Sequence, residues 1–280
     1  MDHSTRSSIA GPARSRAHRR RFDQFYTRRS VAAWCYERLW IYLWPTDYTF
    51  IEPSAGDGAF SDIMPPGRFA CDIDPQGDGI VKLDFFDFEL PYDDRVVVVG
   101  KPPFGRNSSL AIRFFNNAAC GAEIIAFIVP RSFKKVSIQN RLNPHFHLRR
   151  EWAVPDEAFL FDGRRKTVPT VFQIWEWSPE PRPLQILETC HFDFDFVSAG
   201  EGDFAIQRVG SGAGRIHDKI SLSENAHYFI KAKFLQVEFV MRMIDFSCVV
   251  DRTAGKPSLA KTELVELYAQ QKKAFLDHSH

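Results

Sequence analysis

The sequence has few cysteines, and their spacing is typical of neither a zinc site nor a disulfide framework. An odd number of isolated thiols favours a reducing compartment, so we expect a cytoplasmic or nuclear protein. The absence of paired cysteines also predicts no metal site. The thiols are spread along 280 residues, at Cys35, Cys71, Cys120, Cys190 and Cys248.

Long hydrophobic runs and an excess of charge are missing as well. No apolar stretch reaches the roughly 20 residues that a helix needs to cross a bilayer. The basic N-terminus is not followed by the apolar segment of a secretory signal. We therefore expect no membrane partner. The net charge is only +1, so no overall basic field indicates a polyanionic partner.

The basic residues are nevertheless distributed unevenly. Residues 1–21 are rich in serine, arginine and alanine and poor in apolar side chains, which predicts a disordered basic arm. Such an arm is either a solvated tail or a contact for phosphate groups. The basic residues near this end are Arg14, Arg16, His18, Arg19, Arg20, Arg21, Arg28 and Arg29.

The remaining chain is organised around the stretch from Arg95 to Gly105. Its four consecutive valines predict a strand that is buried on both faces of a parallel sheet. Pro102 and Pro103 end that strand, because proline donates no hydrogen bond to a sheet. Phe104 then lies just past the carboxyl edge, where open α/β sheets bind ligands. An ordinary strand followed by a proline-rich turn is the plainer interpretation.

A glycine-containing turn about fifty residues upstream favours a ligand site at this edge. A short apolar strand ends at Glu52, a turn with Gly56 and Gly58 follows, and we expect a helix to begin near Ala59. Glycines in such a turn permit positive φ angles and a close backbone approach to a ligand. The dinucleotide and phosphate-loop glycine motifs are both absent. An acidic strand end favours a cationic or hydroxyl-bearing ligand over a phosphate.

Two further predicted strands, residues 69–75 and 79–86, also carry an acid near their carboxyl ends, Asp72 and Asp84. Aspartate is common in turns, so each acid has an ordinary explanation when taken alone. Acids at the ends of three neighbouring strands instead predict an edge that binds a ribose and an adenine.

Strands and helices alternate along the first 177 residues. Helices are expected over 31–43, with Ser30 as the N-cap, and over 108–119, and a fifth strand is expected over 123–130. A closing antiparallel hairpin follows, with a turn at Asp162-Gly163. The prediction is an α/β, Rossmann-like, doubly wound and mostly parallel sheet. Its parts are the arm (1–21), the main domain (22–177) and a small C-terminal lobe (178–280), joined by a proline-rich linker at 178–183.

These residues together resemble the class I S-adenosylmethionine-dependent methyltransferases of the N6-adenine amino type, over roughly residues 22–177. The resemblance implies that S-adenosyl-L-methionine is the cofactor. The segment from Phe25 to Thr27 is similar to the motif that covers its methionine part, and Glu52 to Gly58 resembles the glycine loop. Asp72 resembles the ribose-binding acid, and Asp84 the acid that binds the adenine amine. The implied cofactor-binding residues are Tyr26, Thr27, Glu52, Ser54, Gly56, Gly58, Asp72 and Asp84.

The implied catalytic residues are Lys101, Pro102, Pro103 and Phe104, and the first departs from the family. The family carries Asn or Asp there, whose side chain accepts a hydrogen bond from the target amine. The proline carbonyl accepts a second one, and the aromatic ring stacks on the base. A protonated lysine has three donors and no acceptor. Burial and a neighbouring cation favour the neutral amine, which accepts one hydrogen bond.

The predicted function is methyl transfer to adenine N6 in nucleic acid, either DNA or RNA. The amine has to be reached outside the base stack. The basic loop at 131–141 is either solvated or a phosphate-facing surface beside the pocket. One alternative is a catalytically impaired protein that binds cofactor or nucleic acid as a scaffold. The departure from the family at Lys101 is the feature that distinguishes this alternative from an active methyltransferase. A small-molecule or protein methyltransferase is a third possibility, which a closed pocket without a basic rim would favour.

Overall fold

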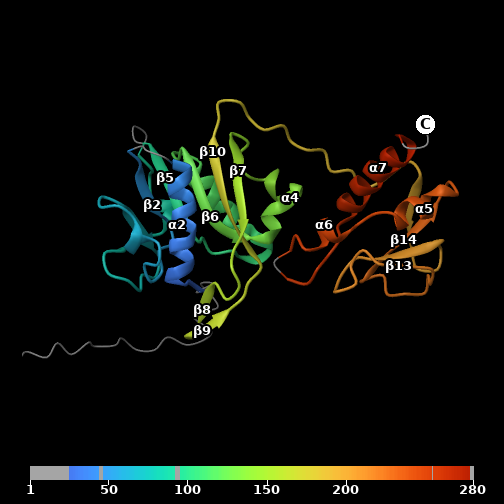
Figure 1. Cartoon of the computed structure of the whole chain (residues 1–280), viewed down its shortest axis with the longest axis horizontal. Helices are drawn as coiled ribbons and strands as arrows, with labels where there is room; N and C mark the ends of the chain where they lie inside the picture. The colour runs from blue at the N-terminus through green and yellow to red at the C-terminus, as the bar shows by residue number, and fades with distance from the viewer. Residues whose placement is uncertain (1–24, 44–46, 92–94, 254, 278–280) are drawn as a thin grey trace, which may run out of the picture.

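The computed structural model describes residues 25–43, 47–91, 95–253 and 255–277, which form a larger and a smaller lobe (Figure 1). The basic arm predicted over residues 1–21 lies outside this part of the chain. In the larger lobe, seven strands form one sheet in the order β4-β3-β2-β5-β6-β10-β7. Its strands are β2 (Thr49–Glu52), β3 (Phe69–Asp72), β4 (Val81–Lys82), β5 (Val96–Gly100), β6 (Ile124–Pro130), β7 (Phe146–Ala153) and β10 (Thr170–Trp177).

The pairing of these strands confirms the predicted fold class. The five strands from β4 to β6 run parallel to their neighbours, whereas β10 is antiparallel to both β6 and β7. The chain therefore forms a mostly parallel α/β sheet that is closed by an antiparallel pair of strands.

Strand β5 shows why the sheet is covered on both faces. Val96 and Val98 pack into the cluster that contains helix α3 (Ser109–Ala118). Val97 and Val99 point the other way, into the cluster that contains helix α2 (Arg29–Leu43). Because side chains alternate along a strand, a run of four valines supplies both cores at once. All four valines are completely buried.

The order of the strands determines where a ligand site can form. Strand β2 lies in the middle of the sheet, β3 and β4 extend to one side, and the chain then crosses to β5 on the other side. The connections that leave β2 and β5 therefore diverge at the carboxyl edge. Open α/β sheets bind ligands in the crevice at such a switch point.

The helix expected near Ala59 does not form. The glycine turn leads only into a short 3-10 helix, η1 (Ser61–Ile63), and Met64 is already extended, with φ −76° and ψ 158°. Pro65 explains this ending, because a proline disfavours helical backbone at the residue before it.

The third predicted strand, over 79–86, is shorter than expected. Only Val81–Lys82 pair with β3, and a 3-10 helix, η2 (Phe85–Asp87), begins directly after Asp84. The Asp84 side chain accepts a hydrogen bond from the Phe86 backbone N–H at 3.1 Å. This cap turns the chain so that Phe85 enters the core instead of extending the strand.

Two further local predictions are corrected. Ser30 is not an N-cap, because helix α2 already includes Arg29, and the carbonyl of Arg28 accepts from Val31 and Ala32. The turn at 162–163 does not join the strands that close the main sheet. It joins β8 (Phe159–Phe161) to β9 (Arg164–Lys166), which form a separate small sheet with β1 (Tyr26–Thr27).

The smaller lobe has its own sheet and its own hydrophobic cluster. The sheet order is β11-β14-β12-β13, and helices pack on it. The placement of a domain boundary near residue 178 stays a prediction. The elements are β11 (Phe194–Val197), β12 (Phe204–Gln207), β13 (Ile216–His217), β14 (His227–Ala232), α5 (Gln236–Arg242), α6 (Ser247–Val250) and α7 (Lys261–Asp277).

The connection between the lobes, residues 178–190, contains no regular helix or strand but is fixed at its start. The guanidinium of Arg182 donates to the carbonyl of Phe146 at 2.5 Å and to three further carbonyls between residues 139 and 143. Asn140 and Gln185 exchange two more hydrogen bonds. Directly between the lobes, Lys135 Nζ lies 3.2 Å from the carboxylate of Glu263.

Two expected absences can be compared with the described part of the chain. No helix within it is long and apolar enough to cross a membrane. All five cysteines lie within it, and each is a free thiol.

Candidate functional site

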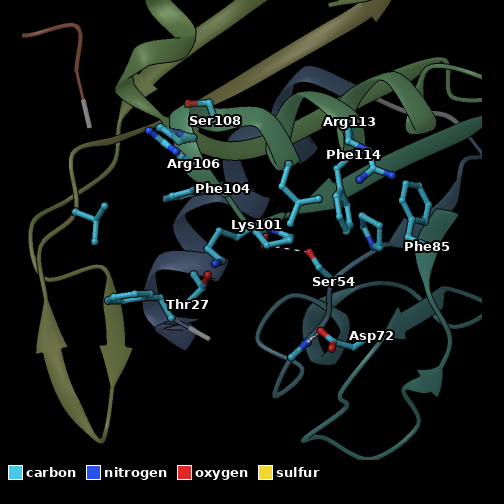
Figure 2. Close-up of a pocket in the computed structure, with 18 of the residues that line it drawn as sticks. Thr27, Ser54, Asp72, Phe85, Lys101, Phe104, Arg106, Ser108, Arg113 and Phe114 are labelled. Carbon is cyan, nitrogen blue, oxygen red and sulfur yellow. Dashed lines mark hydrogen bonds between the residues drawn. The ribbon is translucent and has the colours of Figure 1, made fainter. Parts of the chain in front are cut away.

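A cavity of about 1100 Å³ opens at the predicted carboxyl edge of the main sheet, at the switch point of the strand order (Figure 2). Its wall is completed from the smaller lobe by Arg252, Thr253 and Gly255. Gly58 and Pro102, which the sequence placed in the site, are buried behind this wall. The other predicted site residues line the cavity: Tyr26, Thr27, Glu52, Ser54, Gly56, Asp72, Asp84, Lys101, Pro103 and Phe104.

The glycine turn after β2 is held in shape by the next strand. Gly56 has a φ of +56°, and its N–H donates to Asp72 Oδ2 at 2.8 Å. A Cβ atom at Gly56 would lie 3.1 Å from the ring of Tyr26, so a larger residue would need both a strained backbone and a shift of that ring. Asp72 also accepts from the N–H of Asp74 at 2.7 Å. Asp72 therefore organises the loop as well as lining the cavity.

Arg29, which sequence reasoning assigned only to a general basic cluster, fixes the other side of the same turn. Its guanidinium donates to the carbonyls of Gly58 at 2.7 Å and Asp57 at 2.9 Å, and it forms an ion pair with Asp62. No motif in the sequence identified this contact, because the two segments meet only in the folded chain.

Glu52 is a buried carboxyl group in the cavity wall, with 2% of its surface exposed. It accepts a hydrogen bond from the Ser61 N–H at 2.8 Å and lies against Gly100. Burial raises its pKa well above the usual value, and the neighbouring Asp72 and Asp57 carboxylates act in the same direction. Burial also raises the pKa of Asp57. A cationic ligand would favour the ionised forms of these carboxyl groups.

The cavity is aromatic near Asp84. Phe85 stacks against Phe114 at 5.5 Å between ring centres, and Phe86 meets Phe114 edge to face at 4.9 Å. The guanidinium of Arg113 lies 4.3 Å from the centre of the Phe86 ring. Figure 2 shows Phe85, Phe114 and Arg113 together on the side of the cavity away from Phe104. A flat heterocycle fits such a wall, with the Asp84 carboxylate available at its edge.

Lys101 and Phe104 form the opposite part of the cavity, at the exit of β5. Lys101 is 9% exposed, and its Nζ lies 5.0 Å from the centre of the Phe104 ring. Its side chain is directed towards Thr27 and away from Asp72 (Figure 2). Its backbone carbonyl accepts a hydrogen bond from Ser54 Oγ at 3.0 Å, which ties the β5 exit to the glycine loop.

The backbone that follows Phe104 is unusually strained. Gly105, Asn107 and Ser108 all have positive φ angles, of +67°, +51° and +63°. A Cβ atom at Gly105 would lie 2.7 Å from the Cβ atom of Leu110, so only glycine fits there. Non-glycine residues in this region cost of the order of 1–3 kcal/mol each and tend to occur at functional sites. The tight turn brings Arg106 to the rim of the cavity.

The basic residues near the cavity fall into two groups. Lys134 and Lys135, from the predicted phosphate-facing loop, form ion pairs with Glu151 and Glu263. By contrast, Arg106 and Arg113 line the cavity without an ion pair to any residue that the structure describes. Arg252 also lines it, and its Nε donates to the Cys248 carbonyl at 3.0 Å. The unpaired cations are therefore arginines that the sequence analysis did not single out.

Comparisons with known proteins found matches among solved structures but not among protein families or curated proteins. No protein-family model matches the chain, and no curated protein matches it. Among solved structures, it is similar to the 23S rRNA methyltransferase ErmE, with 17% sequence identity and a TM-score of 0.39. That match covers 56% of this chain and 71% of the other. We therefore base the functional proposal on the geometry of the cavity.

Proposed function

We propose that the protein is an S-adenosylmethionine-dependent methyltransferase that acts on adenine N6 in nucleic acid. One observation carries the proposal: a single cavity joins two acidic strand ends, a glycine turn and the exit of β5 that contains Lys101 and Phe104. These elements are far apart in sequence, and the switch point of the sheet brings them together.

The residues present fit this cofactor. Asp72 and Asp84 are carboxylates that can accept hydrogen bonds from ribose hydroxyls and from an adenine amine. Phe85 and Phe114 offer an apolar wall for the adenine ring. The carboxyl groups of Glu52, Asp72 and Asp84 line the same cavity and suit a ligand that carries positive charge, as this sulfonium compound does.

When bound, the cofactor supplies an electrophilic methyl group, and the chain positions the acceptor. The Phe104 ring stacks against the target base, and a backbone carbonyl at the exit of β5 accepts one hydrogen from its amine. Lys101, as the neutral amine, accepts the other and orients the nitrogen lone pair. The base enters the cavity outside its stack, because the reacting nitrogen is inaccessible within a duplex.

The arginine at the rim supports a nucleic-acid acceptor over a small-molecule one. Arg106 has no acidic partner in the described part of the chain, whereas other surface cations are paired with carboxylates. Unpaired guanidinium groups beside a pocket suit phosphate oxygens, which they bind with two donors.

Lys101 itself favours a second candidate, a scaffold that binds cofactor or nucleic acid without methyl transfer. In its protonated form Lys101 donates only, and it already lies against the ring that the base needs. Titration calorimetry with S-adenosylmethionine, followed by a tritiated-methyl assay on mixed DNA and RNA, separates the two candidates. Binding with transfer supports the enzyme, and binding without transfer supports the scaffold. No binding at millimolar cofactor contradicts the enzyme and leaves only a scaffold that binds nucleic acid.

A further inference from the structure

Helix α5 of the smaller lobe exposes a stripe of large apolar side chains. Leu235, Phe239 and Met243 follow one another at four-residue intervals, and 101%, 56% and 47% of their surfaces are exposed. Residues 235 and 243 flank the helix with right-handed helical backbone angles, so all three lie on one face. Leucine and phenylalanine in such a row on a surface are unusual for a side that faces only water.

Neighbouring segments add further exposed apolar side chains beside the stripe. Phe192 and Phe234 lie 5.9 Å apart between ring centres, and Phe239 meets Phe275 of helix α7 at 5.7 Å. Leu276 follows Phe275 and is also exposed. We call this surface the α5 patch, and it consists of Phe192, Phe234, Leu235, Phe239, Met243 and Leu276.

We propose that a second copy of this chain covers the α5 patch and forms a twofold-symmetric dimer. The stripe has the symmetry that such a dimer needs, because Leu235 and Met243 lie four residues on either side of Phe239. Two antiparallel α5 helices that cross at Phe239 place Leu235 of each copy beside Met243 of the other. A twofold interface requires the same surface on both copies to be complementary to itself in this way.

The charges around the patch also favour a copy of the same chain. Lys231 and Lys233 are paired with Asp203 and Asp195, at 2.6 and 2.8 Å. Arg242 forms ion pairs with Glu238 and Asp218 on the same chain. These groups carry three positive and four negative charges, so they form no basic surface that would attract a nucleic acid or an acidic partner. A surface with an apolar centre and balanced charges at its edge is suited to an identical surface.

The size of the patch is sufficient for a dimer of moderate affinity. A large apolar side chain exposes about 150–250 Å², so the six partly exposed residues together present roughly 700 Å². A stable interface buries about 800 Å² on each partner. The patch lies close to this value, so we expect a dimer that dissociates on dilution.

The dimer leaves the cavity accessible. In Figure 1, helix α5 lies at the end of the smaller lobe that faces away from the main sheet. The proposal is therefore independent of methyl transfer and can be tested on the full chain without any ligand.

The test is sedimentation-velocity ultracentrifugation of the full chain between roughly 1 and 100 µM, a range that spans the dissociation of a weak dimer. We expect the wild type to shift from monomer to dimer across this range. Leu235→Arg and Phe239→Asp should each remain monomeric. Leu235 is fully exposed, so its replacement leaves the fold intact, and an unchanged thermal midpoint checks this. The control is Ile41→Asp on helix α2, which is 76% exposed in the other lobe and should dimerise like the wild type.

Three outcomes would overturn the proposal. A wild type that stays monomeric at the highest concentration means that no second copy covers the patch. A dimer that persists in both α5 variants forms through another surface. A series of larger oligomers without a limiting size means that the contact is not twofold.

Discussion

The side-chain nitrogen of Lys101 lies 5.0 Å from the centre of the Phe104 ring. This is within the roughly 6 Å over which an ammonium group is attracted to an aromatic face. The lysine therefore occupies one face of the ring on which an incoming base would stack. This placement makes Lys101 the most informative position for mutagenesis.

Lys101→Asn is expected to increase methyl transfer to adenine strongly. Asparagine supplies the side-chain acceptor for the target amine and no longer lies over Phe104. The gain should occur mainly in kcat, because orientation of the amine matters most in the transition state. The measurement is a tritiated-methyl assay on single-stranded DNA and on RNA.

Lys101→Met is the matched control for this variant, since it removes the amine without adding an acceptor. It should remain far below Lys101→Asn if the acceptor is what matters. Adding Phe104→Ala to Lys101→Asn should remove the gain, because base stacking contributes about 1–3 kcal/mol. A wild type that is more active than Lys101→Asn would mean that the lysine is a working part of the site.

Asp72→Ala is expected to weaken S-adenosylmethionine binding by more than tenfold. The lost interactions are charge-assisted hydrogen bonds, worth about 1.5–3 kcal/mol. Asp72 also holds the N–H groups of Gly56 and Asp74, so part of the loss comes from a looser loop. Asp72→Asn keeps one acceptor oxygen and should lose less affinity than Asp72→Ala.

Titration calorimetry measures these affinities. The control is Asp78→Ala, an exposed acid on the same segment that does not line the cavity and should bind like the wild type. Equal affinity in Asp72→Ala and the wild type would rule out a ribose contact.

Arg106→Ala is expected to weaken binding of nucleic acid and to reduce its salt dependence. Each phosphate contact contributes about 0.7–0.9 to the slope of log affinity against log salt concentration. The measurement is fluorescence anisotropy with a labelled oligonucleotide at several salt concentrations. Arg149→Ala removes an exposed arginine that is paired with Glu176 away from the cavity, and it should keep the wild-type slope. Identical slopes in all three proteins would exclude a phosphate contact at Arg106.

Glu52→Gln is expected to flatten the dependence of stability on pH in the ligand-free protein. Burial raises the pKa of Glu52 in the folded state above the unfolded value of about 4.3. Its contribution is fully present below that unfolded value. As pH rises, the unfolded chain releases the proton first, so the free energy of unfolding falls until pH passes the folded pKa.

Urea unfolding between about pH 5 and pH 8 tests this, since one proton corresponds to about 1.4 kcal/mol per pH unit. Glutamine keeps the acceptor for the Ser61 N–H and cannot ionise. Glu89→Gln, at an exposed position, is the control and should keep the wild-type slope. A Glu52→Gln slope equal to that of the wild type would mean that Glu52 ionises normally.

The sequence predicted the sheet well because its strongest signals are local. Four valines between a charged residue and two prolines specify a buried strand with a defined end. The acids that end β2 and β3 follow from the same logic, since the carboxyl ends of parallel strands share one edge. The predictions failed where one residue decides between similar conformations. Pro65 prevents the helix after the glycine turn, and the Asp84 side chain ends the third strand early.

Contacts between distant segments could not be predicted from the sequence. Arg29 fixes the glycine turn through two carbonyls, and such acceptors leave no trace in the residue types. Arg252 reaches the cavity from the other lobe, which only the folded chain reveals. The packing of Lys101 could not be predicted either. Its position in the motif was evident from the sequence, but its approach to the Phe104 ring depends on the rotamer of the lysine side chain.

The hydrogen bonds of Arg182 limit how far the two lobes can separate. They fasten the connecting segment to the larger lobe, and the Asn140–Gln185 bonds extend that attachment by a few residues. The chain that is free to straighten is then residues 186–190, which can span only about 17 Å when fully extended. The smaller lobe therefore stays within this distance of the larger lobe, so the effective concentration of its residues at the cavity remains high even when the contacts between the lobes open.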